Sequence, residues 1–108
     1  MKIQLLYFES CPGWQQTQKN LENALDELSL NVDFKLLEIT QPIQLPEAFY
    51  GSPTIRYQKQ DSEEWKELFD MTGESVMACR TYHFGGKITP YVPKDLLREK
   101  LQEIIQNE

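Results

Sequence analysis

The sequence predicts an α/β fold with the element order β-α-β-β-β-α and a central mixed sheet of four strands. Residues 3–8 form a nearly continuous apolar run, which is typical of a strand covered on both faces. Residues 32–36 alternate between apolar and polar, which predicts a second strand. Between these runs, apolar residues recur at helical spacing at Leu21, Ala24, Leu25 and Leu28. A strand-helix-strand order requires a parallel pair joined by a helical crossover.

Prolines mark the start of the first helix and the connection after the second strand. Pro12 suits an early helical position, because its missing N–H would have no partner there, and we expect the helix to begin near it. The second strand is expected to end near Ile39. Pro42 and Pro46 then leave room only for a short helical turn at residues 47–49.

The second half of the chain predicts two further strands with a long segment between them. The third strand is expected at residues 54–57, after a Ser-Pro dipeptide. Residues 58–75 are rich in carboxylates and predict a polar insertion between strands three and four. Three apolar side chains are expected to dock this insertion on the body: Trp65, Leu68 and Phe69.

The last expected elements are a fourth strand and a C-terminal helix. Residues 76–84 predict the strand, which a turn at Gly85 and Gly86 ends. Pro93 begins the helix. One apolar stripe along this helix consists of Leu97, Leu101, Ile104 and Ile105.

Composition limits the class of protein. A chain of 108 residues forms one domain, 1–108, and can bury a single core. It contains no apolar run of the ~20 residues that span a bilayer, and we expect a cytoplasmic protein without a membrane partner. The net charge of -6 argues against nucleic acid as a partner. Two cysteines do not make a disulfide framework, and a reducing compartment would keep both as thiols.

Cys11 lies at the predicted junction between the first strand and the first helix. A thiol there faces unpaired backbone N–H groups and the positive end of the helix dipole, which favour the thiolate. Such cysteines have a pKa below the ordinary value of ~8.5, although the nearby Glu9 opposes the shift. We therefore expect a functional thiol; the alternative is a small buried apolar residue at a strand end.

Three short motifs occur in an order that resembles a known family. Cys11-Pro-Gly-Trp14 follows the first strand, Gly51-Ser-Pro-Thr54 precedes the third, and Gly85-Gly86 precedes the last helix. Together they resemble the thioredoxin-like superfamily, and within it the glutaredoxin branch most of all.

The resemblance implies a fold and a set of site residues. It implies a cis bond between Ser52 and Pro53, with the loop from Ser52 to Thr54 docking a bound peptide or glutathione. It also implies that Gly85 and Gly86 contact the terminal carboxylate of glutathione.

Trp14 departs from the family pattern, because a second cysteine would normally stand at this position. It cannot release a mixed disulfide, which leaves monothiol chemistry with an external thiol such as glutathione as co-substrate and no bound cofactor. Trp14 is then expected either to form an apolar wall beside the sulfur or to lie on the surface of the helix.

Cys79 is the other candidate for a resolving thiol. A packed, inert cysteine in the fourth strand is the favoured interpretation, and a Cys11–Cys79 redox pair stays open. Cα atoms more than ~7 Å apart would exclude that bond. His83, the only histidine, is expected to be a polar strand or turn residue, and no ligand spacing supports a metal site.

The sequence thus predicts a monothiol thiol–disulfide oxidoreductase or glutathione-dependent redox protein with Cys11 as nucleophile. Its partner would be a thiol or disulfide, on a protein or on glutathione. The alternative is a non-catalytic binding module of the same fold that holds a protein segment or a soft metal ion.

Overall fold

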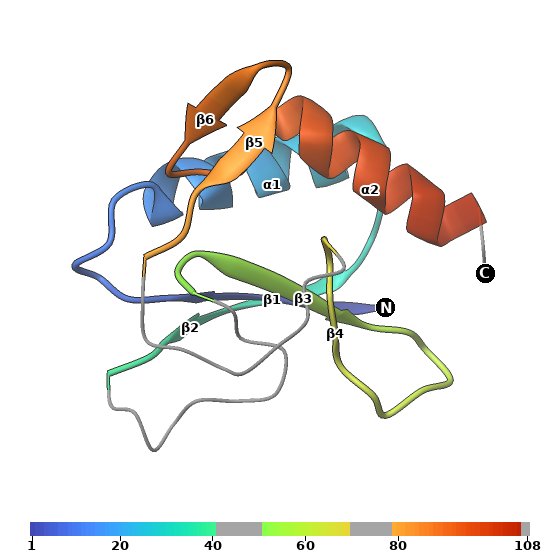
Figure 1. The fold of residues 1–108 in the computed structure, drawn as a ribbon. Coiled ribbons are helices and arrows are strands. Elements are labelled where there is room, and N and C mark those ends of the chain that lie inside the picture. The colour runs from blue at the N-terminus through green and yellow to red at the C-terminus, as the bar shows by residue number, and fades with distance from the viewer. Residues whose placement is uncertain (41–50, 70–78, 107–108) are drawn as a thin grey trace.

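A computed structural model of the chain describes residues 1–40, 51–69 and 79–106. The described part contains a four-stranded mixed sheet, two helices and a separate two-stranded hairpin. Figure 1 shows both helices and the hairpin on the same side of the sheet. The predicted helical turn at 47–49 lies outside the described residues.

The N-terminal half forms the predicted parallel unit. Strand β1 (Lys2–Tyr7) leads through helix α1 (Trp14–Glu27) to strand β2 (Asp33–Glu38). Strands β1 and β2 pair in parallel along their whole length, from Lys2 opposite Asp33 to Tyr7 opposite Glu38. The order and type of these elements confirm the prediction made from the apolar run, the helical stripe and the alternating stretch.

Helix α1 begins at Trp14, two residues after the Pro12 start that the sequence favours. The residue that precedes it, Gly13, has a φ of 92°, which an L side chain rarely adopts. A Cβ atom at this position would lie 2.2 Å from the carbonyl oxygen of Pro90. The left-handed turn and the close passage of the chain segment before α2 therefore hold Pro12 and Cys11 outside the helix.

Strand β3 (Thr54–Gln58) pairs antiparallel with β1, and strand β4 (Lys66–Glu67) pairs antiparallel with β3. The sheet order is therefore β2-β1-β3-β4, with β1 in the centre. The predicted four-stranded mixed sheet is confirmed. Its fourth strand lies inside the expected insertion at 58–75, not at 76–84.

The segment expected as the fourth strand instead forms a hairpin of its own. Strand β5 (Tyr82–Phe84) pairs antiparallel with strand β6 (Lys87–Thr89), while residues 76–78 lie outside the described part. Gly85 and Gly86 connect the two strands with φ angles of 61° and 78°. Two consecutive positive φ angles make a tight hairpin turn, and the backbone of residues 82–84 is paired locally as a result.

Helix α2 (Lys94–Gln106) packs beside α1 over the sheet. The two faces of β1 contribute to two separate apolar clusters. Ile3 and Leu5 belong to the main core between the sheet and the helices. Leu6 and Phe8 belong to a second cluster that also contains Cys11 and Ile39. Neither of the described helices is long and apolar enough to cross a membrane.

Candidate redox site at a disulfide

Cys11 and Cys79 are joined by a disulfide bond, with their Cα atoms 5.5 Å apart. Cys11 lies in the loop between β1 and α1, where its backbone N–H donates a hydrogen bond to the carbonyl of Phe8. Its side chain is buried, with 3% of the residue exposed, whereas Cys79 is exposed. The interpretation of Cys79 as a cysteine packed in a strand was wrong, because Cys79 is exposed, lies outside the described strands and is bonded to Cys11.

The backbone of Cys79 lies along the loop that precedes β3. Ser52 and Cys79 form an isolated parallel bridge, and the N–H of Arg80 donates a 2.9 Å hydrogen bond to the carbonyl of Ser52. The hydroxyl oxygen of Ser52 accepts a 2.8 Å hydrogen bond from the N–H of Phe8, which fixes this loop beside the end of β1. The Ser52–Pro53 bond is cis, as the resemblance implies. The carbonyl of Ser52, a backbone acceptor in the predicted docking loop, is therefore already hydrogen-bonded to the segment that contains Cys79.

Arg80 fastens the same segment through its side chain. Its guanidinium forms a 2.6 Å ion pair with Glu67, and the two side chains are 10% and 2% exposed. The same group lies 3.2 Å from the hydroxyl of Thr54 and 4.4 Å from the ring centroid of Tyr82. No motif in the sequence predicts this pair. A carboxylate at Glu67, between the docking residues Trp65 and Leu68, was the available signal, because a buried charge requires a partner.

Tyr82 closes the contact between the hairpin and the loop. Its hydroxyl donates a hydrogen bond to the carbonyl of Pro53, and its ring packs edge-on against Phe69. Burial raises the pKa of the Tyr82 hydroxyl well above its ordinary value, although the Arg80 charge acts in the opposite direction. Tyr82 therefore stays neutral and positions the segment that contains Cys79.

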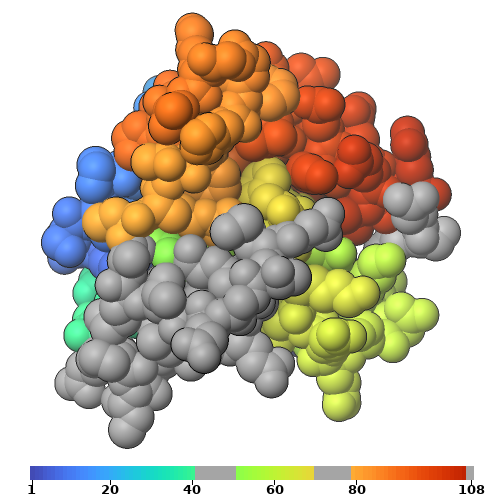
Figure 2. Space-filling model, viewed as in Figure 1, coloured from blue at the N-terminus to red at the C-terminus, as the bar shows by residue number. Residues whose placement is uncertain are grey.

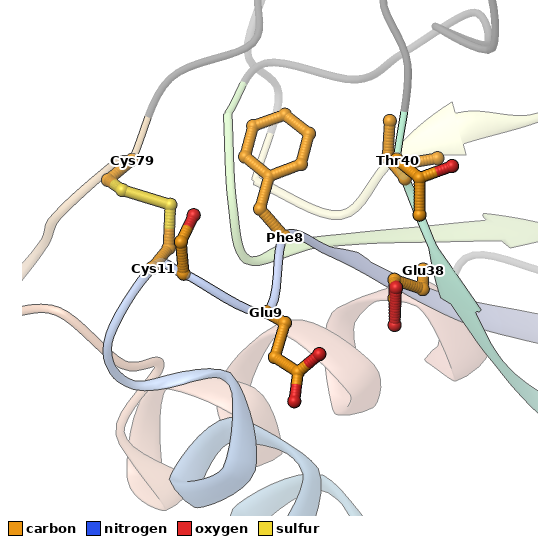
Figure 3. A pocket seen from close by; sticks show the side chains of 8 residues that line it. Phe8, Glu9, Cys11, Glu38, Thr40 and Cys79 are labelled. Carbon is orange, nitrogen blue, oxygen red and sulfur yellow. A yellow bond between two sulfur atoms is a disulfide. The ribbon is translucent and has the colours of Figure 1, made fainter.

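A cavity of about 450 Å³ lies beside the disulfide. In Figure 3 the disulfide lies at one end, Glu38 and Thr40 lie at the other, and Phe8 and Glu9 lie between them. Eight described residues line it: Phe8, Glu9, Ser10, Cys11, Glu38, Ile39, Thr40 and Cys79. The charged groups among them are two carboxylates, so the lining is acidic.

These two carboxylates also affect the pKa of the neighbouring Tyr7. Its pKa is raised, first by burial and then by the negative charges of Glu38 and Glu9. Trp14 stacks on the Tyr7 ring, with centroids 4.1 Å apart and planes 19° from parallel. It does not belong to the described lining of the cavity, and its contact is with Tyr7 at the start of α1.

The remaining predicted site residues are not brought to the disulfide. Gly85 and Gly86 are exposed in the hairpin turn, and Gly85 lines a different cavity beside the start of α2. Their contact with a carboxylate stays a prediction. His83 is exposed in β5. Figure 2 shows the segment from Cys79 through the hairpin, in orange, lying between the blue N-terminal region and the red helix α2.

No family model, curated protein or solved structure matches the chain. Among residues 1–40, 51–69 and 79–106, no group of three or more histidine, cysteine, aspartate or glutamate side chains could hold a metal ion.

Proposed function

We propose that the chain is a thiol–disulfide oxidoreductase of thioredoxin-like fold, with Cys11 and Cys79 as its exchanging pair. The observation that carries this proposal is a disulfide between an exposed cysteine and a buried one at the edge of a cavity. Support for the fold comes from the parallel β1-α1-β2 unit, whose first loop contains Cys11, and from the cis Ser52–Pro53 bond beside the end of β1.

The unequal exposure of the two cysteines assigns them different roles. An incoming thiolate attacks the Sγ of the exposed Cys79 and forms a mixed disulfide, while the electron pair of the broken S–S bond leaves on Cys11. A second thiolate then attacks the partner sulfur of the mixed disulfide and releases Cys79. The two partner thiols become a disulfide, and their two protons end on Cys11 and Cys79. A disulfide substrate is reduced by the same steps in reverse.

The environment of Cys11 suits a leaving thiolate. Helix α1 starts close by, its N-cap residue Gly13 supplies no side-chain hydrogen bond, and its first turn contains no acidic residue. The partial positive charge of the first N–H groups of the helix is therefore not offset by a side chain, and it stabilises a neighbouring anion. This proposal replaces a single nucleophile at Cys11 with a two-cysteine cycle, in which Cys79 forms the mixed disulfide and Cys11 is the resolving thiol.

Single-cysteine variants test the assignment. We expect Cys11→Ser to form a mixed disulfide with a small labelled disulfide faster than Cys79→Ser does, because the remaining cysteine is an exposed residue in the first variant and a buried one in the second. We also expect the wild type to catalyse exchange between a thiol and a small disulfide above the uncatalysed rate. A native wild-type disulfide that external thiols do not reduce would refute the proposal and favour a binding module with a structural disulfide.

A further inference from the structure

We propose that the redox partner of this site is a positively charged thiol or disulfide, such as an aminothiol or a cysteine in a basic peptide segment. The inference rests on the proposed exchange and concerns the partner that the same site selects. It differs from the expectation of glutathione, which has two carboxylates and one ammonium and is a net anion.

The first support is the distribution of charge around the disulfide. Glu9 and Glu38 are the charged residues in the described lining, and the other polar side chains there, Ser10 and Thr40, are neutral. In Figure 3 Glu9 lies between the disulfide and the far end of the cavity, and Glu38 lies at that far end. A partner that reaches Cys79 through this cavity therefore approaches two negative charges.

The second support is that the neighbouring positive charge is already neutralised. Arg80 follows Cys79 directly in the chain, but its guanidinium pairs with Glu67 at 2.6 Å and stacks on Tyr82. Both members of the ion pair are nearly buried. This arginine has an anion of its own and does not offset the carboxylates of the cavity.

The third support comes from the amino-acid sequence alone. The segments 41–50 and 70–78 continue the chain from Thr40 and precede Cys79, and their structure is not described. Neither segment contains a lysine, arginine or histidine, whereas together they contain Glu47, Asp70 and Glu74. No basic side chain can reach the disulfide from these two segments.

The fourth support is that both carboxylates act on a common neighbour. The negative charges of Glu38 and Glu9 each contribute to the raised pKa of Tyr7, which precedes the lining residue Phe8. Their fields therefore overlap at Tyr7. An attacking thiolate adds negative charge at the sulfur, and a cationic group on the same molecule offsets the repulsion that it meets.

The test measures reduction of the wild-type disulfide by small thiols that share a two-carbon chain and differ in charge. The probes are cysteamine (cationic), 2-mercaptoethanol (neutral) and 2-mercaptoethanesulfonate (anionic), each at equal thiolate concentration. Each rate is divided by the rate of the same thiol with an uncharged small disulfide, which removes differences in intrinsic nucleophilicity. We expect cysteamine to exceed the sulfonate on the order of fivefold at low ionic strength. The ratio should fall toward one in high salt, because the carboxylates are exposed and therefore screened.

Two pairs of substitutions separate the cavity from the overall charge of the protein. The double variant Glu9→Gln/Glu38→Gln should bring the cysteamine-to-sulfonate ratio close to one. The control Glu22→Gln/Glu99→Gln removes the same number of charges from exposed helix positions outside the cavity and should keep the wild-type ratio. An equal shift in both double variants would overturn the proposal, because the net charge alone would then explain the preference.

The outcomes distinguish this inference from the proposed function. If all three thiols reduce the native disulfide at the same normalised rate, the charge preference is wrong and the exchange activity stands. If none of them reduces it, the proposed function itself fails.

Discussion

Loss of the Cys11–Cys79 bond should lower the free energy of unfolding by about 4 kcal/mol. The cross-link joins residues 68 positions apart, so it removes the closure entropy of a long loop from the unfolded chain. Cys79→Ser is the cleanest perturbation. Cys79 is exposed and its replacement removes the bond with little loss of packing, whereas Cys11→Ser would also disturb a buried position.

The assay is urea unfolding of oxidised wild type, reduced wild type and Cys79→Ser, followed by circular dichroism. Reduced wild type and Cys79→Ser should have the same free energy of unfolding in urea. In a parallel thermal scan, both should unfold on the order of 15 °C below the oxidised protein. The bond is verified by mass spectrometry of the alkylated protein. If oxidised wild type and Cys79→Ser differ by less than about 1 kcal/mol, the loop-entropy reasoning is refuted.

Three further perturbations test single features of the structure, each by urea unfolding. Gly13→Ala should lower the free energy of unfolding by about 3 kcal/mol, because it combines a positive φ with a backbone clash. The control Gly85→Ala, whose Cβ would meet nothing within 4 Å, should lower it by about 1 kcal/mol. Equal losses would contradict the close approach at Gly13. Glu67→Gln should lower the free energy of unfolding by about 3 kcal/mol, since it leaves the nearly buried Arg80 without its anion. The exposed control Glu64→Gln should leave this free energy almost unchanged, and similar losses in both variants would argue against the ion pair. Folding raises the pKa of Tyr82 above its ordinary value of 10.0. The neutral hydroxyl therefore stabilises the folded state fully below pH 10.0, and this contribution is lost as the pH rises above 10.0. The loss amounts to at most about 1.4 kcal/mol per pH unit. Tyr82→Phe should flatten this alkaline decline, and parallel declines in the two proteins would rule out the assignment.

The sequence was sufficient to predict those elements whose apolar pattern matches the side chains that the fold buries. The apolar run of β1 predicts a strand covered on both faces, and the fully buried Leu5 and Leu6 of β1 belong to two different apolar clusters. The stripes of α1 and α2 predict the faces that contact the core, where Leu21, Leu97 and Leu101 are fully buried. The cis Ser52–Pro53 bond followed from the resemblance and not from any local pattern.

The fourth strand could not be predicted in the same way, because its stabilising contacts are not local. Strand β4 consists of Lys66 and Glu67, and it depends on pairing with β3 and on the ion pair with Arg80. Neither residue has the apolar alternation that marks a strand. The two glycines after Phe84 indicated a turn correctly, but the sequence did not reveal that the turn joins two short strands outside the main sheet.

The position of Cys79 was missed for a related reason. Adjacent residues of a strand point to opposite faces, and placing Cys79 in a strand separated it from Cys11 and from Arg80. In the structure a single bridge to Ser52 replaces that strand, and the sulfur and the guanidinium reach different partners on either side of the loop.

The disulfide also divides the molecule mechanically. When the protein is pulled by its two ends, tension passes from β1 through Cys11 directly to Cys79, and residues 12–78 between them lie outside the path of the force. Helix α1 and strands β2, β3 and β4 are then protected from extension, and only β1, the hairpin and α2 bear the load. Reduction returns the enclosed chain to the path and adds roughly 230 Å of extensible length at about 3.4 Å per residue. The redox state of one bond therefore sets how far this protein can be stretched.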